Sequence, residues 1–353
     1  MCDLNQNATC FSCISENGFY IYDINPVRKR WGNAVKSKLY MASPHYKTEW
    51  VVLVCGDEDD CGPTHLKIWN DRQQMVLSDI KFSEPILCVA HTRTCLAIGF
   101  AHEIKIYHLK DLTLLETYPT KNPHGVLSST FVCNESIFAF PGVNDGYIHI
   151  VRIEMDDHHD KVISQNTYEM KTHDHIIVAC AVSHHGGYMA TASEHGTIIR
   201  VWSLHSRHML TEFRRGSSST VVHHLQWNAN DTYLLSTSAR GTIHIFHAMS
   251  QEDNTKSLLN WASSVLPAYF SDTWSRHKID LNIPELKNCI ACFTNDVLHP
   301  THNTIIVTAL CHDTQKIWKF VLNTETNTVD RSDYVDLSSD INILADAKIR
   351  ISV

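Results

Sequence analysis

The 353-residue sequence predicts an all-β fold, a seven-bladed β-propeller, on three observations. Short strand-like runs rich in β-branched and aromatic residues recur seven times along the chain. Most of them are separated by 38 to 51 residues, which is the period expected when each repeat is one four-stranded blade. Helical patterns would alternate with the strands of an α/β enzyme, and none is found before residue 256.

The repeated runs define the expected blades in order. They are Tyr20-Ile21-Tyr22, Lys67-Ile68-Trp69, Lys105-Ile106-Tyr107, His149-Ile150-Val151, Arg200-Val201-Trp202, His244-Ile245-Phe246 and Lys316-Ile317-Trp318. Between their middle residues the steps are 47, 38, 44, 51, 44 and 72 residues. Four runs follow a turn residue and a glycine, at Asn17-Gly18, Asp145-Gly146, His195-Gly196 and Arg240-Gly241. We expect these turns to join the second and third strands of a blade.

The last step is longer than its neighbours by about 28 residues, and loops of that length in compact folds are usually functional or disordered. The extra residues fall at 250–277, inside the sixth blade. We therefore predict one propeller domain over residues 1–345, with a long loop at 250–277, followed by a short tail at 346–353.

Composition and charge narrow the function. A hydrophobic fraction of 43% and a charged fraction of 19% are ordinary for a folded protein. The net charge of −8 argues against broad adhesion to nucleic acid or to anionic membranes, so phosphate binding would need a local site. The absence of an 18-residue apolar run and of a signal-peptide layout, with twelve cysteines, predicts a reducing, cytoplasmic location.

No nucleophile-elbow, phosphate-loop or dinucleotide motif occurs in the sequence, so we expect a protein that is not an enzyme and has no cofactor. The pairs Cys10/Cys13 and Cys289/Cys292 have the spacing of zinc ligands. Residues three apart in a strand point to opposite faces, so neither pair is expected to hold a metal. The acidic and histidine-rich segment at 156–160 is interpreted as a solvated loop.

The most informative motif is Phe213-Arg214-Arg215-Gly216. Successive side chains of an extended strand point to opposite faces, so Arg214 and Arg215 could serve two ligands, one on either side. A planar guanidinium matches phosphate with parallel hydrogen bonds. The alternative is that the arginine pair is only a solvated turn.

Over nearly its full length the sequence resembles the PROPPINs, the seven-bladed propellers of autophagy that bind polyphosphoinositides. The resemblance is carried by the Phe-Arg-Arg-Gly motif and by five further stretches: residues 10–22, Lys67 to Asp71, Phe138 to Gly142, Ala190 to Trp202 and Gly241 to Phe246. It implies an effector of phosphatidylinositol 3-phosphate or 3,5-bisphosphate that is recruited from the cytoplasm to preautophagosomal, endosomal or vacuolar (lysosomal) membranes.

The resemblance also implies two phosphoinositide sites flanking the arginine pair. The first would use His173, Ser193, Gly196, Thr197, Arg200 and Arg214. The second would use Arg215, Gly216, Ser238, Thr242 and His244. Protonation of His173 or His244 would add positive charge, so we expect phosphate binding to strengthen between pH 7.5 and pH 6.

Structural interpretations of the same residues stay open. The serine and threonine residues are ordinary turn formers, His173 could be bonded within its blade, and Arg200 could pair with a carboxylate of the blade. The rival function is a propeller scaffold that binds proteins only, through acidic peptides on the arginine pair.

The long loop is expected to insert into the membrane, because it concentrates apolar side chains in a connecting segment. These are Leu258, Leu259, Trp261, Val265, Leu266, Tyr269, Phe270 and Trp274. The alternative is that the loop packs on its own blade. The resemblance further implies an autophagy lipid-transfer protein as a partner, and we expect a monomer in solution.

Overall fold

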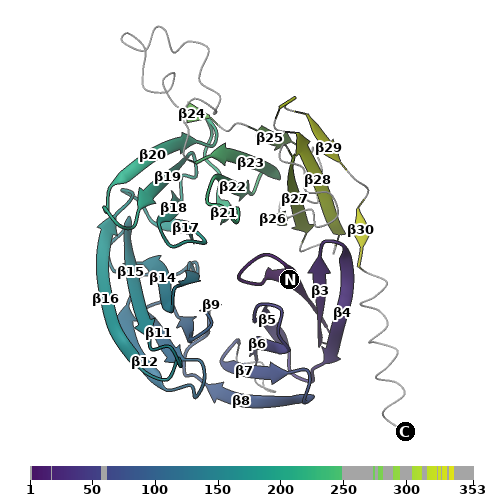
Figure 1. Cartoon of the computed structure of the whole chain (residues 1–353), viewed down its shortest axis with the longest axis vertical. Coiled ribbons are helices and arrows are strands. Elements are labelled where there is room, and N and C mark those ends of the chain that lie inside the picture. The colour runs from purple at the N-terminus through teal and green to yellow at the C-terminus, as the bar shows by residue number, and fades with distance from the viewer. Residues whose placement is uncertain are drawn as a thin grey trace. The chain divides into compact units, whose positions relative to one another are not determined.

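The computed structural model describes residues 2–16, 18–56, 62–248, 273–274, 277–280, 289–294, 304–311, 316–323, 325–326, 328–331 and 334–337. It divides into two compact units, residues 1–89 with 292–353 and residues 90–291. The described parts of both units contain strands and turns and no helix (Figure 1).

In the described residues the strands form seven sheets, and the first four are antiparallel meanders of four strands each. The first is β1 (Cys2–Leu4), β2 (Cys10–Ser15), β3 (Gly18–Ile24) and β4 (Val27–Ala34). The second is β5 (Leu39–Pro44), β6 (Trp50–Cys55), β7 (His65–Asn70) and β8 (Met75–Lys81). The third is β9 (Cys88–His91), β10 (Cys95–Gly99), β11 (Glu103–His108) and β12 (Leu114–Pro119). The fourth is β13 (Ser128–Val132), β14 (Glu135–Pro141), β15 (Tyr147–Met155) and β16 (Val162–Lys171).

The last three sheets keep this order with additions. The fifth is β17 (Ile177–Val182), β18 (Tyr188–Ser193), β19 (Ile198–Ser203) and β20 (Met209–Arg214), with β24 (Thr273–Trp274) paired in parallel on β20. The sixth is β21 (Val222–Trp227), β22 (Tyr233–Ser238), β23 (Thr242–His247) and β25 (His277–Asp280). The seventh is β26 (Cys289–Thr294), β27 (Thr304–Cys311), β28 (Lys316–Asn323) and β29 (Val329–Arg331), with β30 (Val335–Asp336) on β28.

The expected fold class is confirmed: the protein is an all-β, seven-bladed β-propeller. Each repeated run lies in the third strand of its sheet, from β3 to β28. The turns at Gly146, Gly196 and Gly241 all lie between a second and a third strand, and all three glycines have positive φ. Their φ values fall in the left-handed region, which explains why glycine stands there.

The core between the fifth and sixth sheets fixes the strands that carry the arginine motif. Phe213 of β20 stacks on Phe246 of β23, with ring centroids 4.8 Å apart. Trp227 of β21 donates from Nε1 to the carbonyl of Ala181 over 3.0 Å. These aromatic side chains are almost fully buried, and burying each one contributes about 1.5–3 kcal/mol. Arg214 and Arg215 therefore follow directly on an anchored side chain.

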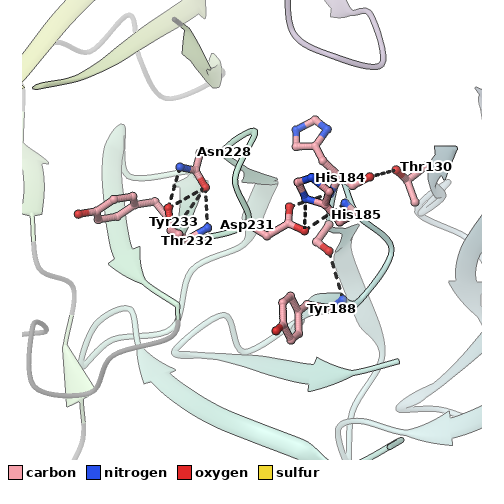
Figure 2. A network of polar contacts seen from close by, with 9 residues as sticks. Thr130, His184, His185, Tyr188, Asn228, Asp231, Thr232 and Tyr233 are labelled. Atoms are coloured by element: carbon pink, nitrogen blue, oxygen red, sulfur yellow. Dashed lines mark hydrogen bonds and ion pairs between the residues drawn. The ribbon is translucent and has the colours of Figure 1, made fainter. Parts of the chain in front are cut away.

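A second contact between these two sheets is centred on Asp231, in the turn between β21 and β22 (Figure 2). Its carboxylate accepts the backbone N–H groups of His184 and His185 over 2.9 and 3.1 Å. The imidazole Nδ1 of His185 lies 3.1 Å from the same carboxylate. His184 and His185 precede the first residue of β18, whereas Ser193 is its last residue. The Asp231 contacts therefore connect the two sheets at the end of β18 that is remote from the arginine motif.

Candidate functional site

Two consecutive blades of the second unit present the same turn between their second and third strands. In the fifth sheet the N–H of Gly196 donates to the carbonyl of Ser193 over 2.8 Å. In the sixth sheet the N–H of Gly241 donates to the carbonyl of Ser238 over 2.9 Å. A threonine follows each glycine. The predicted residues of the two sites thus come from equivalent turns on neighbouring blades.

Gly196 is required by a close approach of the backbone. Its φ is +58°, and a Cβ atom added there would lie 1.8 Å from the carbonyl oxygen of Thr220. Any side chain would therefore displace the segment that leads into β21. Gly216 differs, because a Cβ added at that residue would meet no atom within 4 Å.

The turn of the sixth sheet carries three predicted residues, and all are buried. The Ser238 hydroxyl lies 3.2 Å from the Thr242 hydroxyl, and either group can be the donor. The His244 ring is stacked near Phe246, with centroids 6.2 Å apart. The structure thus brings these three residues of the second predicted site together on one turn and its following strand.

Arg214 is the last residue of β20 and is half-buried. Its backbone lies between two strands, opposite Ile198 of β19 on one side and Trp274 of β24 on the other. The neighbouring turn residues of the first predicted site are Ser193, which is buried, and Thr197, which is half-buried. Ser193 ends β18, Thr197 directly precedes β19 and Arg214 ends β20, so the three residues come from three consecutive strands of one sheet.

Arg215 lies beyond the end of the strand and is only 3% exposed. Its backbone N–H donates to the carbonyl of Thr197 over 2.8 Å. Its guanidinium donates from Nε to the carbonyl of Gly196 over 2.5 Å and from Nη2 to the carbonyl of Ser218 over 2.6 Å. Burial, together with the nearby Arg240, lowers the pKa of Arg215 to about 10. The side chain therefore braces the turn of the first predicted site, although the sequence assigned it to the second.

Arg200 is paired with a carboxylate of its own blade. Its Nε donates to Glu212 over 2.7 Å, and its Nη1 donates to the carbonyl of Thr172 over 2.8 Å. Glu212 lies directly opposite Arg200 on β20. The structure thus shows the alternative role considered for Arg200, pairing with a carboxylate of its blade.

His173 is buried and bonded within the fifth blade. Its Nε2 lies 3.1 Å from the Thr191 hydroxyl, and that hydroxyl accepts the Trp202 indole N–H over 3.1 Å. The hydroxyl has a second acceptor lone pair and one proton, so either the imidazole or the hydroxyl can be the donor, depending on the tautomer of the ring. Burial, and secondly the charge of Arg200, lowers the pKa of His173 to about 4. The expectation that His173 gains charge between pH 7.5 and pH 6 is therefore wrong, because its ring stays neutral there.

Three residues near the two turns were missed by the sequence reasoning. Arg240 is exposed in the turn of the sixth sheet and is close enough to lower the pKa of Arg215. His175 and His195 pack edge to face beside the turn of the fifth sheet, with ring centroids 4.1 Å apart. The signal for Arg240 was present in the sequence, because it stands directly before the turn glycine Gly241.

The cysteine pair Cys10/Cys13 has separate partners. Cys10 donates from Sγ to the carbonyl of Tyr46 over 3.1 Å, and the Sγ of Cys13 lies 2.9 Å from that of Cys2. Burial raises the pKa of the Cys10 thiol to about 11, which favours its protonated form. Within the described residues, no group of three or more histidine, cysteine or acidic side chains is arranged to hold a metal ion.

Most of the predicted membrane-inserting loop lies outside the described residues, at 250–272 and 275–276. Of the eight side chains named for it, only Trp274 belongs to a described strand, β24. The predicted tail at 346–353 also lies outside the described residues. The described residues contain no helix that is long and apolar enough to span a membrane.

Comparison with known proteins identifies the class of protein to which this fold and these turns belong. A family model described as PROPPIN matches residues 1–271. The chain belongs to the PROPPIN family.

Several relatives carry names connected with this family. SVP1-like protein 2 of Eremothecium gossypii is 27% identical over 304 residues, which cover 77% of this chain and 75% of that protein. SVP1-like protein 2 of Pichia angusta is 27% identical over 300 residues, covering 81% and 82%. Autophagy-related protein 18 of Komagataella pastoris is 25% identical over 293 residues, covering 74% and 54%. The homologues therefore include autophagy-related proteins.

Solved structures show the same fold. Hsv2 of Kluyveromyces lactis, described with its complete loop 6CD, aligns with a TM-score of 0.73 at 18% identity, covering 95% of this chain and 98% of that one. The complex of KlAtg21 with the coiled coil of AgAtg16 aligns with a TM-score of 0.67 at 23% identity, covering 95% and 98%.

Proposed function

We propose that the protein is a non-catalytic phosphoinositide effector of autophagy, which binds phosphatidylinositol 3-phosphate or 3,5-bisphosphate at the two turns flanking Arg214 and Arg215. The observation that carries the proposal is the repetition of one turn on neighbouring blades, with the arginine pair directly after β20. Membership in a phosphoinositide-binding family supports it. Each charge-assisted hydrogen bond to phosphate contributes roughly 1.5–3 kcal/mol before the costs of binding are deducted.

The contacts of the individual residues suggest different roles for them within the proposed first site. Arg214, Ser193 and Thr197 are the residues that we assign to the headgroup. Arg200 is held by Glu212, and we infer that it positions β19 beside β20 and adds positive potential. His173 is neutral, and we assign it to holding the blade through Thr191.

In the proposed second site, Ser238, Thr242 and His244 are assigned to the headgroup, with exposed Arg240 as the cation that the sequence reasoning missed. Arg215 contributes by fixing the first turn and by its charge near Arg240. The apolar segment at 250–277 would then insert beside the headgroups and slow release, because stable membrane anchoring usually needs two signals.

The test is liposome flotation with vesicles containing phosphatidylinositol 3-phosphate, compared with matched vesicles containing unphosphorylated phosphatidylinositol. We expect the wild-type protein to float only with the phosphorylated lipid. Arg214→Ala should reduce flotation about tenfold or more, since one charge-assisted contact is lost. The matched control is Arg207→Ala, because Arg207 is an exposed arginine of the same blade that lies over the Tyr168 ring.

The proposal is overturned if folded wild-type protein floats neither with vesicles containing phosphatidylinositol 3-phosphate nor with vesicles containing phosphatidylinositol 3,5-bisphosphate. Equal losses for Arg214→Ala and Arg207→Ala would instead assign the effect to net charge rather than to a site. Binding of acidic peptides by Arg214, without lipid binding, would favour the protein-only scaffold.

A further inference from the structure

A concentration of positive charge in this acidic protein lies far from the arginine motif in sequence, around β4. Residues 24–48 contain six lysines and arginines and no aspartate or glutamate. The whole chain carries a net charge of −8, so this segment has the opposite sign from its surroundings. All of these residues belong to the first unit.

The three exposed cations of β4 are Arg28, Lys29 and Arg30. Lys29 lies over the ring of Tyr20, with its Nζ 4.4 Å from the centroid, and Arg30 donates to the carbonyl of Lys47 over 3.2 Å. In the part of the chain that the structure describes, none of the three forms an ion pair with a carboxylate. Within the described residues these three cations are thus not held in ion pairs, although Asp23, which lies opposite Arg28, pairs with Lys47 of the same basic segment.

β4 is also the terminal strand of its sheet. It pairs with β3 along one edge, and within the described residues no strand pairs with its other edge (Figure 1). An edge strand presents unpaired N–H and C=O groups, and proteins often protect such edges with a lysine. The fourth strands β8, β12 and β16, which also end their sheets, carry net charges of 0, −1 and 0, whereas β4 carries +3. The charge on β4 exceeds what the other edges of this protein use.

We propose that the free edge of β4 binds an extended acidic segment of a partner protein by adding it as a further strand of the first sheet. An extended peptide supplies backbone donors and acceptors at the spacing of a strand edge, which neither a nucleic acid backbone nor a lipid headgroup does. Arg28 and Lys29 lie opposite Asp23 and Tyr22, which are consecutive residues of β3, so they point to opposite faces of the sheet. A flat membrane would meet one of them, and a strand carrying consecutive acidic residues would meet both.

The experiment measures fluorescence anisotropy of a labelled peptide with three consecutive acidic residues flanked by valines, added to the full chain. We expect saturable binding that weakens with added salt. Arg28→Glu combined with Lys29→Glu should weaken binding about tenfold or more, because two cross-strand charge pairs become repulsive. The control is Lys110→Glu combined with Lys161→Glu, which makes the same change in net charge at exposed residues of the other unit.

A second peptide of identical charge, N-methylated at alternate residues, tests the strand addition itself. It should bind about tenfold more weakly or worse, because N-methyl groups remove the donors that an added strand needs. Equal binding of both peptides, or no binding of the first, would overturn the proposal. Vesicles of phosphatidylserine without phosphoinositide provide the remaining arm: β4-dependent flotation without peptide binding would assign this surface to a membrane instead.

Discussion

Arg214 and Arg215 are adjacent in the chain, but their side chains have different surroundings. Arg214 is half-buried at the end of β20, whereas Arg215 is 3% exposed and donates to two backbone carbonyls. The alternation of side chains predicted that they face different ways. It could not predict the burial of Arg215, because the rule applies within a strand and Arg215 lies beyond its end. The sequence therefore predicts which residue types form the candidate site. It does not predict which of the two arginines is buried and bonded to the backbone.

Arg215→Ala is expected to lower the free energy of unfolding by about 1–3 kcal/mol, because the carbonyls of Gly196 and Ser218 would lose a buried charged donor. Arg214→Ala should cost less, since that side chain is only half-buried. Urea unfolding followed by tryptophan fluorescence measures both. A smaller loss for Arg215→Ala than for Arg214→Ala would contradict the bracing role.

His173 predicts a pH dependence of stability. Its pKa is about 4 in the folded protein, against a usual value of 6.5, so between these values the unfolded chain binds a proton that the folded protein excludes. This contribution to stability is fully present above pH 6.5 and is lost as the pH falls towards 4, by up to about 3 kcal/mol. His173→Gln should flatten the dependence of unfolding free energy on pH in this window. Identical slopes for variant and wild type would show that another group is responsible.

At the scale of elements, the third strand of every blade was predictable, because its aromatic and β-branched run repeats along the chain, in four blades with a turn glycine before it. The parallel pairing of β24 on β20 was not, since it joins residues 60 positions apart through two backbone pairs, Phe213 with Thr273 and Arg214 with Trp274. Short pairings of this kind leave no periodic pattern. The turn at Gly196 was predictable in part: the sequence shows the turn glycine, but it does not show that the backbone of Thr220 lies close to it.

Gly196→Ala should destabilise the protein by about 2 kcal/mol or more, because the backbone has a positive φ and a Cβ would collide with the carbonyl of Thr220. Gly187→Ala is the matched control, since a Cβ there meets no atom within 4 Å. Thermal unfolding by circular dichroism compares the two. A control variant as unstable as Gly196→Ala would show that loss of any glycine in this blade, rather than the close approach, causes the effect.

At the scale of the whole molecule, charge is distributed unevenly. The net charge is −8, yet residues 24–48 contain six lysines and arginines and no aspartate or glutamate, and the arginine motif lies in the other unit. A protein of this kind can present two different binding surfaces without general adhesion to anions. The two proposals are therefore separable: Arg214→Ala should leave binding of the acidic peptide unchanged, and the double substitution in β4 should leave phosphoinositide-dependent flotation unchanged.

The pairing of β24 has a consequence for the connectivity of the folded chain. β23 and β25 belong to the sixth sheet, but β24, which lies between them in sequence, belongs to the fifth. If a protease cut the chain between residues 249 and 272, the N-terminal fragment would keep β17 to β23, and the C-terminal fragment would still supply one strand to each of these two sheets. The two fragments would be interlocked by hydrogen bonds in neighbouring blades and would migrate as a single particle until denatured.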